Sequence, residues 1–204
     1  MPDRRRQHIT TGIMAAITSI AALCCLYGCG NRQTTDTGIP RPVAYPRPVI
    51  YDTLYTSAGL PADFEVNASA TVTDAGKSAT SENQPVWVDI TYPAYGATLH
   101  CTFTPVDDEA SREKAMDNRL ERMALNVGDN MAEQTELTSP GGFTTIILST
   151  MGRTLTPLQF LSVGDCWVIS GAMRFHAEAV ETDSVRPLID AVKTDIIHAA
   201  ENIR

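Results

Sequence analysis

Two histidines stand out among the residues that could bind a ligand. His100 lies between Thr98 and Thr102, so a β-strand through this segment would place all three side chains on one polar face. His176 lies two residues before Glu178, and the two would share a face if a later strand continues through them. Imidazole and carboxylate groups carry protons and bind metal ions. His100 and His176 are therefore candidate ligand-facing residues, although solvent exposure is the interpretation that the pattern favours.

The sequence contains none of the familiar motifs for catalysis or metal binding. It has no His-Glu-x-x-His, no paired Cys-x-x-Cys, no Gly-x-Ser-x-Gly elbow and no glycine-rich nucleotide loop. The acidic run at residues 107–109 falls where a helix is expected to begin, which explains its charge without calcium. We predict a non-enzymatic protein with no catalytic residue, metal or cofactor.

The first thirty residues carry the pattern of an exported, lipidated protein. Arginines at positions 4–6 precede an apolar run over residues 13–27, which is short for a membrane span of about 20 residues. Residues 26–29, Leu-Tyr-Gly-Cys, resemble a lipobox, in which signal peptidase II cuts before the cysteine. We predict a signal peptide over residues 1–28 and lipidation of Cys29, with an uncleaved signal-anchor helix as the alternative.

Residues 29–50 are predicted to be a stiff linker that follows the lipid anchor. Pro-Arg-Pro-Val occurs at residues 40–43 and again at residues 46–49, which favours polyproline II. In some bacteria an acidic cluster just after the lipidated cysteine marks export to the cell surface, and no such cluster follows Cys29. We therefore expect the domain on the periplasmic side, and the choice between inner and outer membrane is left open. The formal net charge of −8 argues against nucleic-acid binding, which needs a basic face.

The two remaining cysteines could form a disulfide in an exported protein. Cys101 lies on the apolar face of its predicted strand, whereas Cys166 has the parity opposite to Trp167 and Ile169. Opposite faces of one sheet do not allow the Cα separation of about 5.5 Å that a disulfide requires. Whether Cys101 and Cys166 form a disulfide is therefore left open, and the strand parity argues against it.

Residues 51–204 are predicted to form a single α+β domain. Alternating apolar residues indicate strands over residues 64–72, 86–92, 96–104, 143–150, 156–163 and 166–176. Asp107 or Asp108 can cap a helix, and Asp183 or Ser184 can cap a C-terminal one whose first turn would include Pro187. The two helices carry apolar stripes, namely Met116, Leu120, Met123 and Val127, and then Ile189, Val192, Ile196, Ala199 or Ala200, and Ile203.

This order of elements predicts an antiparallel β-sheet with one helix inserted between strands and a C-terminal helix packed on it. Gly164-Asp165 is expected to form a tight hairpin between the last two strands. Trp87 and Trp167 are expected in the core.

Several segments of this domain resemble the gliding motility lipoproteins called GldD. Residues 87–93 (WVDITYP) and 97–100 (ATLH) are similar to the W-x-x-I-x-Y-P and A-T-I-H segments of that family. Residues 159–161 (QFL) and 195–198 (DIIH) resemble its later strand and closing helix, and the matching segments keep their order over most of residues 40–203. Residues 67–84 fit the family pattern poorly.

The resemblance implies a lipoprotein of the gliding and type IX secretion machinery of Bacteroidota, without a known catalytic activity. Its implied partners are the membrane, through the lipid on Cys29, and other envelope or secretion proteins. The first hypothesis is therefore a membrane-tethered assembly or accessory factor. The second is a periplasmic ligand-binding or hydrolytic lipoprotein that uses the polar sheet face near His100.

Overall fold

The computed structural model describes residues 45–48, 54–57, 59–74, 84–176 and 178–204. All of them belong to one compact unit, Ala44–Arg204. Cys29 and the predicted signal peptide lie outside the described residues, as does most of the predicted linker.

The domain is built around a seven-stranded antiparallel sheet with the strand order β3-β4-β5-β10-β9-β7-β6. Its strands are β3 (Thr71–Asp74), β4 (Val86–Tyr92), β5 (Ala97–Pro105), β6 (Ala132–Thr138), β7 (Thr144–Thr150), β9 (Leu158–Val163) and β10 (Trp167–Phe175). Two small sheets pair β1 (Tyr55–Thr56) with β2 (Val66–Asn67) and β8 (Arg153–Thr154) with β11 (Val180–Glu181). Short 3-10 helices span Pro61–Asp63 and Pro93–Tyr95.

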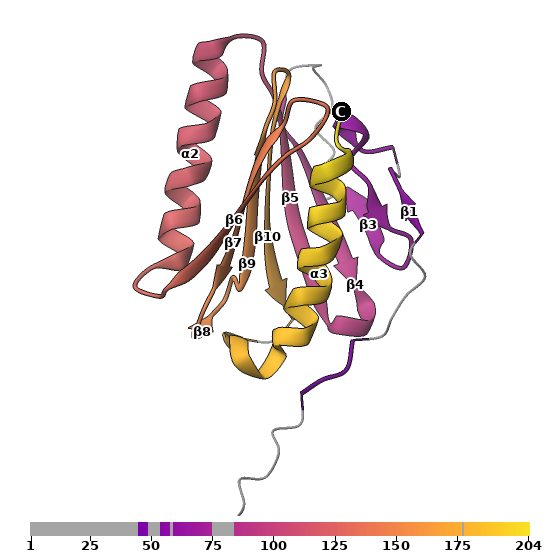
Figure 1. Cartoon of the computed structure of the whole chain (residues 1–204), viewed down its shortest axis with the longest axis vertical. Coiled ribbons are helices and arrows are strands. Elements are labelled where there is room, and N and C mark those ends of the chain that lie inside the picture. The colour runs from indigo at the N-terminus through magenta and orange to yellow at the C-terminus, as the bar shows by residue number, and fades with distance from the viewer. Residues whose placement is uncertain (1–44, 49–53, 58, 75–83, 177) are drawn as a thin grey trace, which may run out of the picture. The chain divides into compact units, whose positions relative to one another are not determined.

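Two helices cover opposite faces of the large sheet (Figure 1). Helix α2 (Glu109–Val127) packs against β9 and β10, and α3 (Thr182–Asn202) packs against β6, β9 and the small strand β2. The predicted α+β class is confirmed, with one helix inserted after β5 and a C-terminal helix on the sheet.

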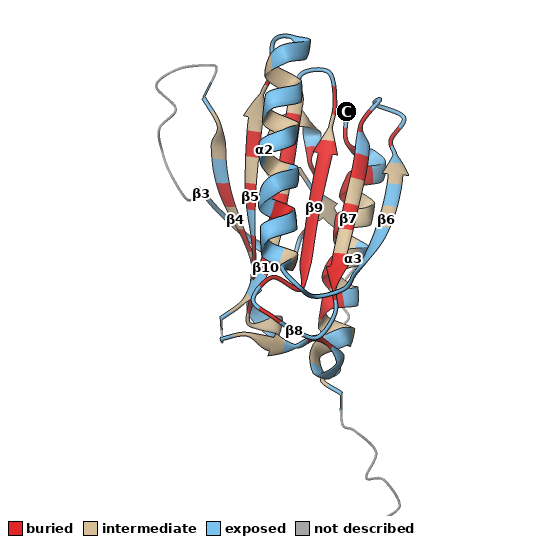
Figure 2. Ribbon diagram, turned by 90° about the vertical axis from the view of Figure 1, so that its left-hand side faces the viewer, coloured by how far each residue is buried: buried red, intermediate tan, exposed pale blue. Residues whose placement is uncertain are grey.

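The two faces of the sheet bury very different amounts of apolar side chain. The face under α3 carries the main core, whose fully buried members include Ile90, Leu99, Phe103, Ile147, Leu158, Phe160, Ile169, Met173 and Ile196. The face under α2 has a cluster of only four buried residues, Val106, Met123, Leu161 and Val168. Figure 2 looks onto this second face, where α2 crosses the middle of the sheet and leaves strands uncovered on both sides. Burial of apolar side chains stabilises the folded state, so the packing of α3 on this face contributes most of that stabilisation.

Helix α2 begins where the sequence predicts. Asp108 is its N-cap, and its carboxylate accepts a hydrogen bond of 2.7 Å from the backbone N–H of Ser111. The Ser111 hydroxyl in turn accepts one from the backbone N–H of Asp108, which completes a capping box. The acidic run at residues 107–109 thus serves the helix start.

Three sequence expectations are wrong in detail. Trp87 is 45% exposed, because Val88 and Ile90 take the core face of β4 and turn Trp87 to the other side. The single strand expected over residues 64–72 is divided between β2 and β3 by a turn at Asn67–Ala70. Pro187 is the sixth residue of α3, beyond its first turn, because the helix begins at Thr182.

Strand β6 is an element that the sequence pattern does not predict. Its residues are mostly polar (AEQTELT), and only Thr135 and Leu137 are half-buried. It pairs only with β7, at an edge of the sheet. Most of its residues are in water, so it has few apolar side chains, and the alternation that usually indicates a strand is missing.

Gly171 gives a direct test of how the main core packs. It lies opposite Phe160 in the β9–β10 ladder, and a Cβ atom at position 171 would collide with the Phe160 ring. We expect Gly171→Ala to lower the free energy of unfolding by about 1–3 kcal/mol, because overpacking forces the ring out of its position. Urea unfolding of the purified chain measures this loss.

A smaller side chain at position 160 should relieve this collision. In a Phe160→Leu background, Gly171→Ala should cost clearly less than in the wild type, because the ring edge is gone. Equal costs in the two backgrounds would contradict this account of the packing.

Candidate functional site

The face of the sheet that carries α2 is polar where the helix does not cover it. β5 turns Thr98, His100 and Thr102 to this side, because the residues between them are buried in the core. In the adjoining strand β10, Ser170 lies opposite Thr102, and Arg174 lies opposite Thr98. The predicted polar face around His100 therefore exists, and we call it the open face.

A groove of about 360 Å³ runs between α2 and the open face. Arg119 and Arg122 of α2 line it together with His100, Thr102 and Ser170 of the sheet. The groove is continuous with a wider hollow of about 870 Å³, since His100, Leu125, Asn126 and Ala172 line both. Arg153, Leu155 and Arg174 line the hollow only. The site thus has guanidinium, amide and hydroxyl groups that can hold a ligand by charge and hydrogen bonding.

A buried amide fixes the helix that forms one wall of the groove. Gln159 of β9 is 1% exposed, and its Oε1 accepts a hydrogen bond of 2.8 Å from Nδ2 of Asn126. Its Nε2 donates to the backbone carbonyl of Met123 at 3.4 Å. Because a buried polar group is costly when unpaired, these bonds hold the C-terminal half of α2 over β9.

His100 is paired at the rim of the groove. Its Nδ1 lies 2.7 Å from Oδ1 of Asp89, and both side chains are at least one-third exposed. A histidine oriented by a carboxylate supplies two of the three members of a catalytic triad, but within the described ranges no hydroxyl or thiol is hydrogen-bonded to its other ring nitrogen. The pair fits an exposed surface contact that can also donate to a bound anion.

His176 lies on the same face but has a different partner. Its Nε2 lies 3.0 Å from Oγ1 of Thr98, which is also 3.3 Å from Oγ1 of Thr91. His100 and His176 therefore do not share a hydrogen-bond partner. In the part of the chain that the structure describes, no three His, Cys, Asp or Glu side chains gather as a metal site would require.

The structure does not bring the two cysteines together. Cys101 is buried on the core face opposite Gly171, and Cys166 is exposed in the β9–β10 hairpin. Burial, and then the charge of Asp89, raise the pKa of the Cys101 thiol, so it stays protonated. Both are free thiols, so the Cys101–Cys166 disulfide that the sequence left open is not formed here.

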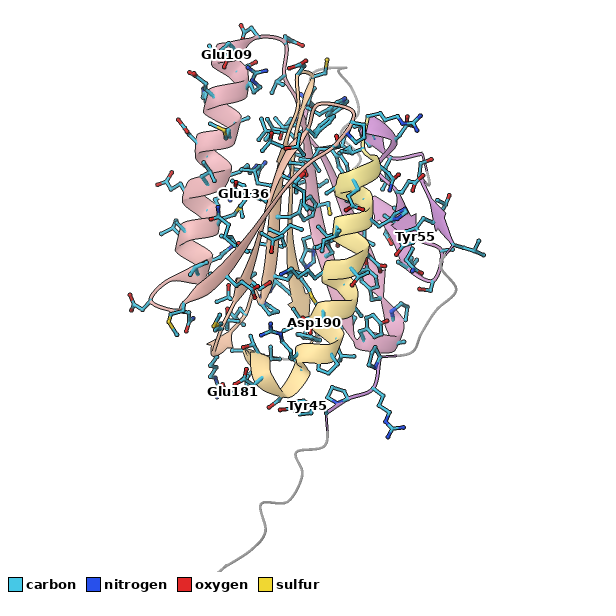
Figure 3. All side chains as sticks on the ribbon, in the orientation of Figure 1. Tyr45, Tyr55, Glu109, Glu136, Glu181 and Asp190 are labelled. Atoms are coloured by element: carbon cyan, nitrogen blue, oxygen red, sulfur yellow. The ribbon has the colours of Figure 1, made fainter. Side chains whose placement is uncertain are left out.

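A second group of titratable side chains lies on the opposite side of the sheet, beside α3. Tyr55 donates a hydrogen bond of 2.8 Å to Oδ1 of Asp195, and Nδ2 of Asn67 donates to the same oxygen at 3.4 Å. His198 stacks on the Tyr55 ring with centroids 3.6 Å apart, and its Nε2 lies 2.7 Å from Oε2 of Glu65. Figure 3 labels Tyr55 next to α3. These contacts fasten the β1–β2 hairpin to α3.

Burial raises the pKa of two side chains in this group, Asp195 and Tyr55. It raises the pKa of Asp195, although hydrogen bonds from Tyr55, Asn67 and Tyr92 act in the opposite direction. Burial and then the Asp195 carboxylate raise the pKa of Tyr55 to about 12. Among the described residues, this group lines neither the groove nor the hollow, so we assign it to the fold and not to ligand binding. The ring of His198 is half-buried against Tyr55.

The arginines of the groove are functional candidates that the sequence pattern does not indicate. Arg119 and Arg122 are three residues apart on the charged side of α2, next to the apolar stripe. Arg174 has the same strand parity as Ala172 and Ser170 in β10. Each position is ordinary in isolation. Only the pairing of β10 with β5, and the placement of α2 over β10, show that these residues face one groove.

Comparison with known proteins identifies a family. The family model described as gliding motility lipoprotein GldD matches residues 35–204, which include every described element. No curated protein and no solved structure matches the chain. Within the described ranges, no helix is both long and apolar enough to cross a membrane.

Asp195 provides a pH test of the α3 group. The folded-state pKa of Asp195 lies above its ordinary value of 3.8, so the protonated carboxyl favours the folded state. This contribution is fully present below the ordinary pKa and is lost as pH rises through the folded-state pKa. The asparagine of Asp195→Asn is neutral at every pH and does not lose this contribution. The free energy of unfolding of Asp195→Asn should therefore rise relative to that of the wild type as the pH increases from about 3 to about 7.

Denaturant unfolding at a series of pH values measures this difference. Glu201→Gln, an exposed carboxylate on the same helix, is the control and should track the wild type across the range. A difference between Asp195→Asn and the wild type that stays constant with pH would contradict the raised pKa.

Proposed function

The chain belongs to the gliding motility lipoprotein GldD family, and we propose on this basis that it is a non-enzymatic assembly or accessory factor of the cell envelope. The single observation that carries this proposal is the family match over residues 35–204. The machinery that it would assist is that of gliding motility and type IX secretion. Its partners would be other proteins of that machinery.

The proposed anchor is a lipid on Cys29. Residues 26–29 supply the lipobox pattern, and acyl chains on a cysteine anchor a protein without a membrane-spanning helix. The repeated Pro-Arg-Pro-Val segment supports a stiff tether between the anchor and the domain. We place the domain on the periplasmic side of the membrane.

The chemistry of the groove supports binding in preference to catalysis. Its polar groups are chiefly guanidinium, amide and hydroxyl groups, which hold ligands but are poor proton carriers at neutral pH. The imidazole of His100, which could carry a proton, is already paired with Asp89.

A second candidate function is a ligand-binding or hydrolytic lipoprotein that uses the polar face near His100. The observation that favours it is the groove itself, because a recess with several converging polar groups is the usual form of a small-molecule site. A small ligand bound at His100 would raise the melting temperature of the wild type and not of His100→Ala.

A deletion strain of a gliding host tests the proposed accessory role. Deletion should abolish colony spreading and reduce type IX secretion, and expression of the wild-type chain should restore both. A deletion strain that glides and secretes normally would refute the proposal.

Labelling with radioactive palmitate tests the anchor. Cys29→Ala should lose the label and the membrane association, because it removes the only proposed acylation site. Cys166→Ala is the matched control, since it removes an exposed free thiol of the domain and should keep the label. Undiminished labelling of Cys29→Ala would contradict the proposed lipidation.

A further inference from the structure

We infer that the groove between α2 and the open face binds an extended acidic segment of a protein partner. The inference rests on the proposed function only in that an accessory factor must recognise another protein. The observations behind it are the arginines of the groove, their lack of carboxylate partners among the described residues, and the shape of the recess.

Positive charge is concentrated in this groove on an acidic protein. The chain has 24 acidic against 16 basic residues, yet four of the eight arginines in its described part line the groove and the hollow. These four are Arg119, Arg122, Arg153 and Arg174. A cluster of one sign on a surface of the other sign steers an oppositely charged partner to that place.

The groove arginines have no carboxylate partners among the residues that the structure describes, whereas two of the other four arginines do. Arg112 pairs with Glu109 and Asp165, and Arg186 pairs with Glu133 and Asp190. The acidic side chain that lines the hollow is Asp129, in the turn after α2, and it pairs with none of these arginines. Nε of Arg122 donates a hydrogen bond of 3.2 Å to Oδ1 of Asn118, which is a neutral side chain. The positive charge of the groove is therefore not neutralised by a described carboxylate and is available to an anionic ligand.

Arg119 carries the strongest physical argument for an anion. Its side chain is half-buried, and this burial, followed by the nearby charge of Arg122, lowers its pKa. A partly desolvated cation without a counter-ion is costly, and a bound anion would remove that cost. Guanidinium groups bind carboxylates through two parallel hydrogen bonds, which gives direction as well as charge.

The spacing of these groups fits an extended peptide. Arg119, Arg122 and Leu125 follow one another at intervals of three residues, so they advance along the groove by about 4.5 Å each. An extended chain advances by about 3.3 Å per residue and can present several side chains along such a line. Leu125 and Leu155 are 73% and 51% exposed in the hollow and offer contacts to apolar side chains. A single phosphate would leave these leucines uncovered, and a flat membrane surface does not enter a recess.

Binding of a synthetic peptide tests the inference on the full chain in neutral detergent micelles. The probe is a fluorescein-labelled peptide with the sequence Glu-Ser-Glu-Leu repeated twice, followed by fluorescence anisotropy. The wild type should bind it, and the Arg119→Gln/Arg122→Gln double variant should bind about tenfold more weakly, because charge-assisted hydrogen bonds are lost. The analogous peptide with lysine in place of glutamate should not bind.

The control variant carries Lys114→Gln and Lys193→Gln, which change the net charge equally but line none of the cavities described above. It should bind the acidic peptide as the wild type does. Equal weakening in both double variants, or no binding to the wild type, would overturn the inference. Binding to inorganic phosphate or to phosphatidylglycerol in the micelles, without binding to the peptide, would overturn it in favour of those anions. These outcomes are independent of the deletion phenotype, so they leave the accessory role to its own test.

Discussion

The alternating side chains of β5, β9 and β10 give the central sheet one apolar face and one largely polar face, and the positions of both helices depend on this difference. The apolar face buries against α3 and forms the main core. The polar face offers α2 only a small apolar cluster around Met123 and Leu161. Helix α2 therefore covers a narrow band of the sheet, with Gln159 holding its C-terminal half, and the strip beside it becomes a groove.

Local patterns in the sequence predict most of this arrangement. The central strands alternate clearly, and Asp108 with Ser111 marks the start of α2, because both signals depend on near neighbours in the chain. Strand β6 was missed because an exposed edge strand needs few apolar residues. The groove was missed because it joins arginines from α2, β8 and β10, and only the strand pairing and helix packing bring them together.

The side chains around Asp195 and the arginines of the groove have different roles in the domain. The side chains around Asp195 form hydrogen bonds with one another and fasten the β1–β2 hairpin to α3, so they stabilise the fold. The arginines of the groove remain available on the opposite side of the sheet. For a lipoprotein of the gliding motility family, a stable core on one face and a charged recess on the other suit a tethered protein that recognises partners.

Site-specific photo-crosslinking in a gliding host tests most directly whether this groove is the recognition surface. A photoreactive amino acid at Leu125 lies in the groove, and one at Lys193 lies on α3, on the other side of the sheet. The account predicts that Leu125 crosslinks to an acidic segment of an envelope protein, mapped by mass spectrometry, and that Arg119→Gln/Arg122→Gln abolishes this product. Crosslinking from Lys193 alone, or a Leu125 product that survives loss of the arginines, would contradict it.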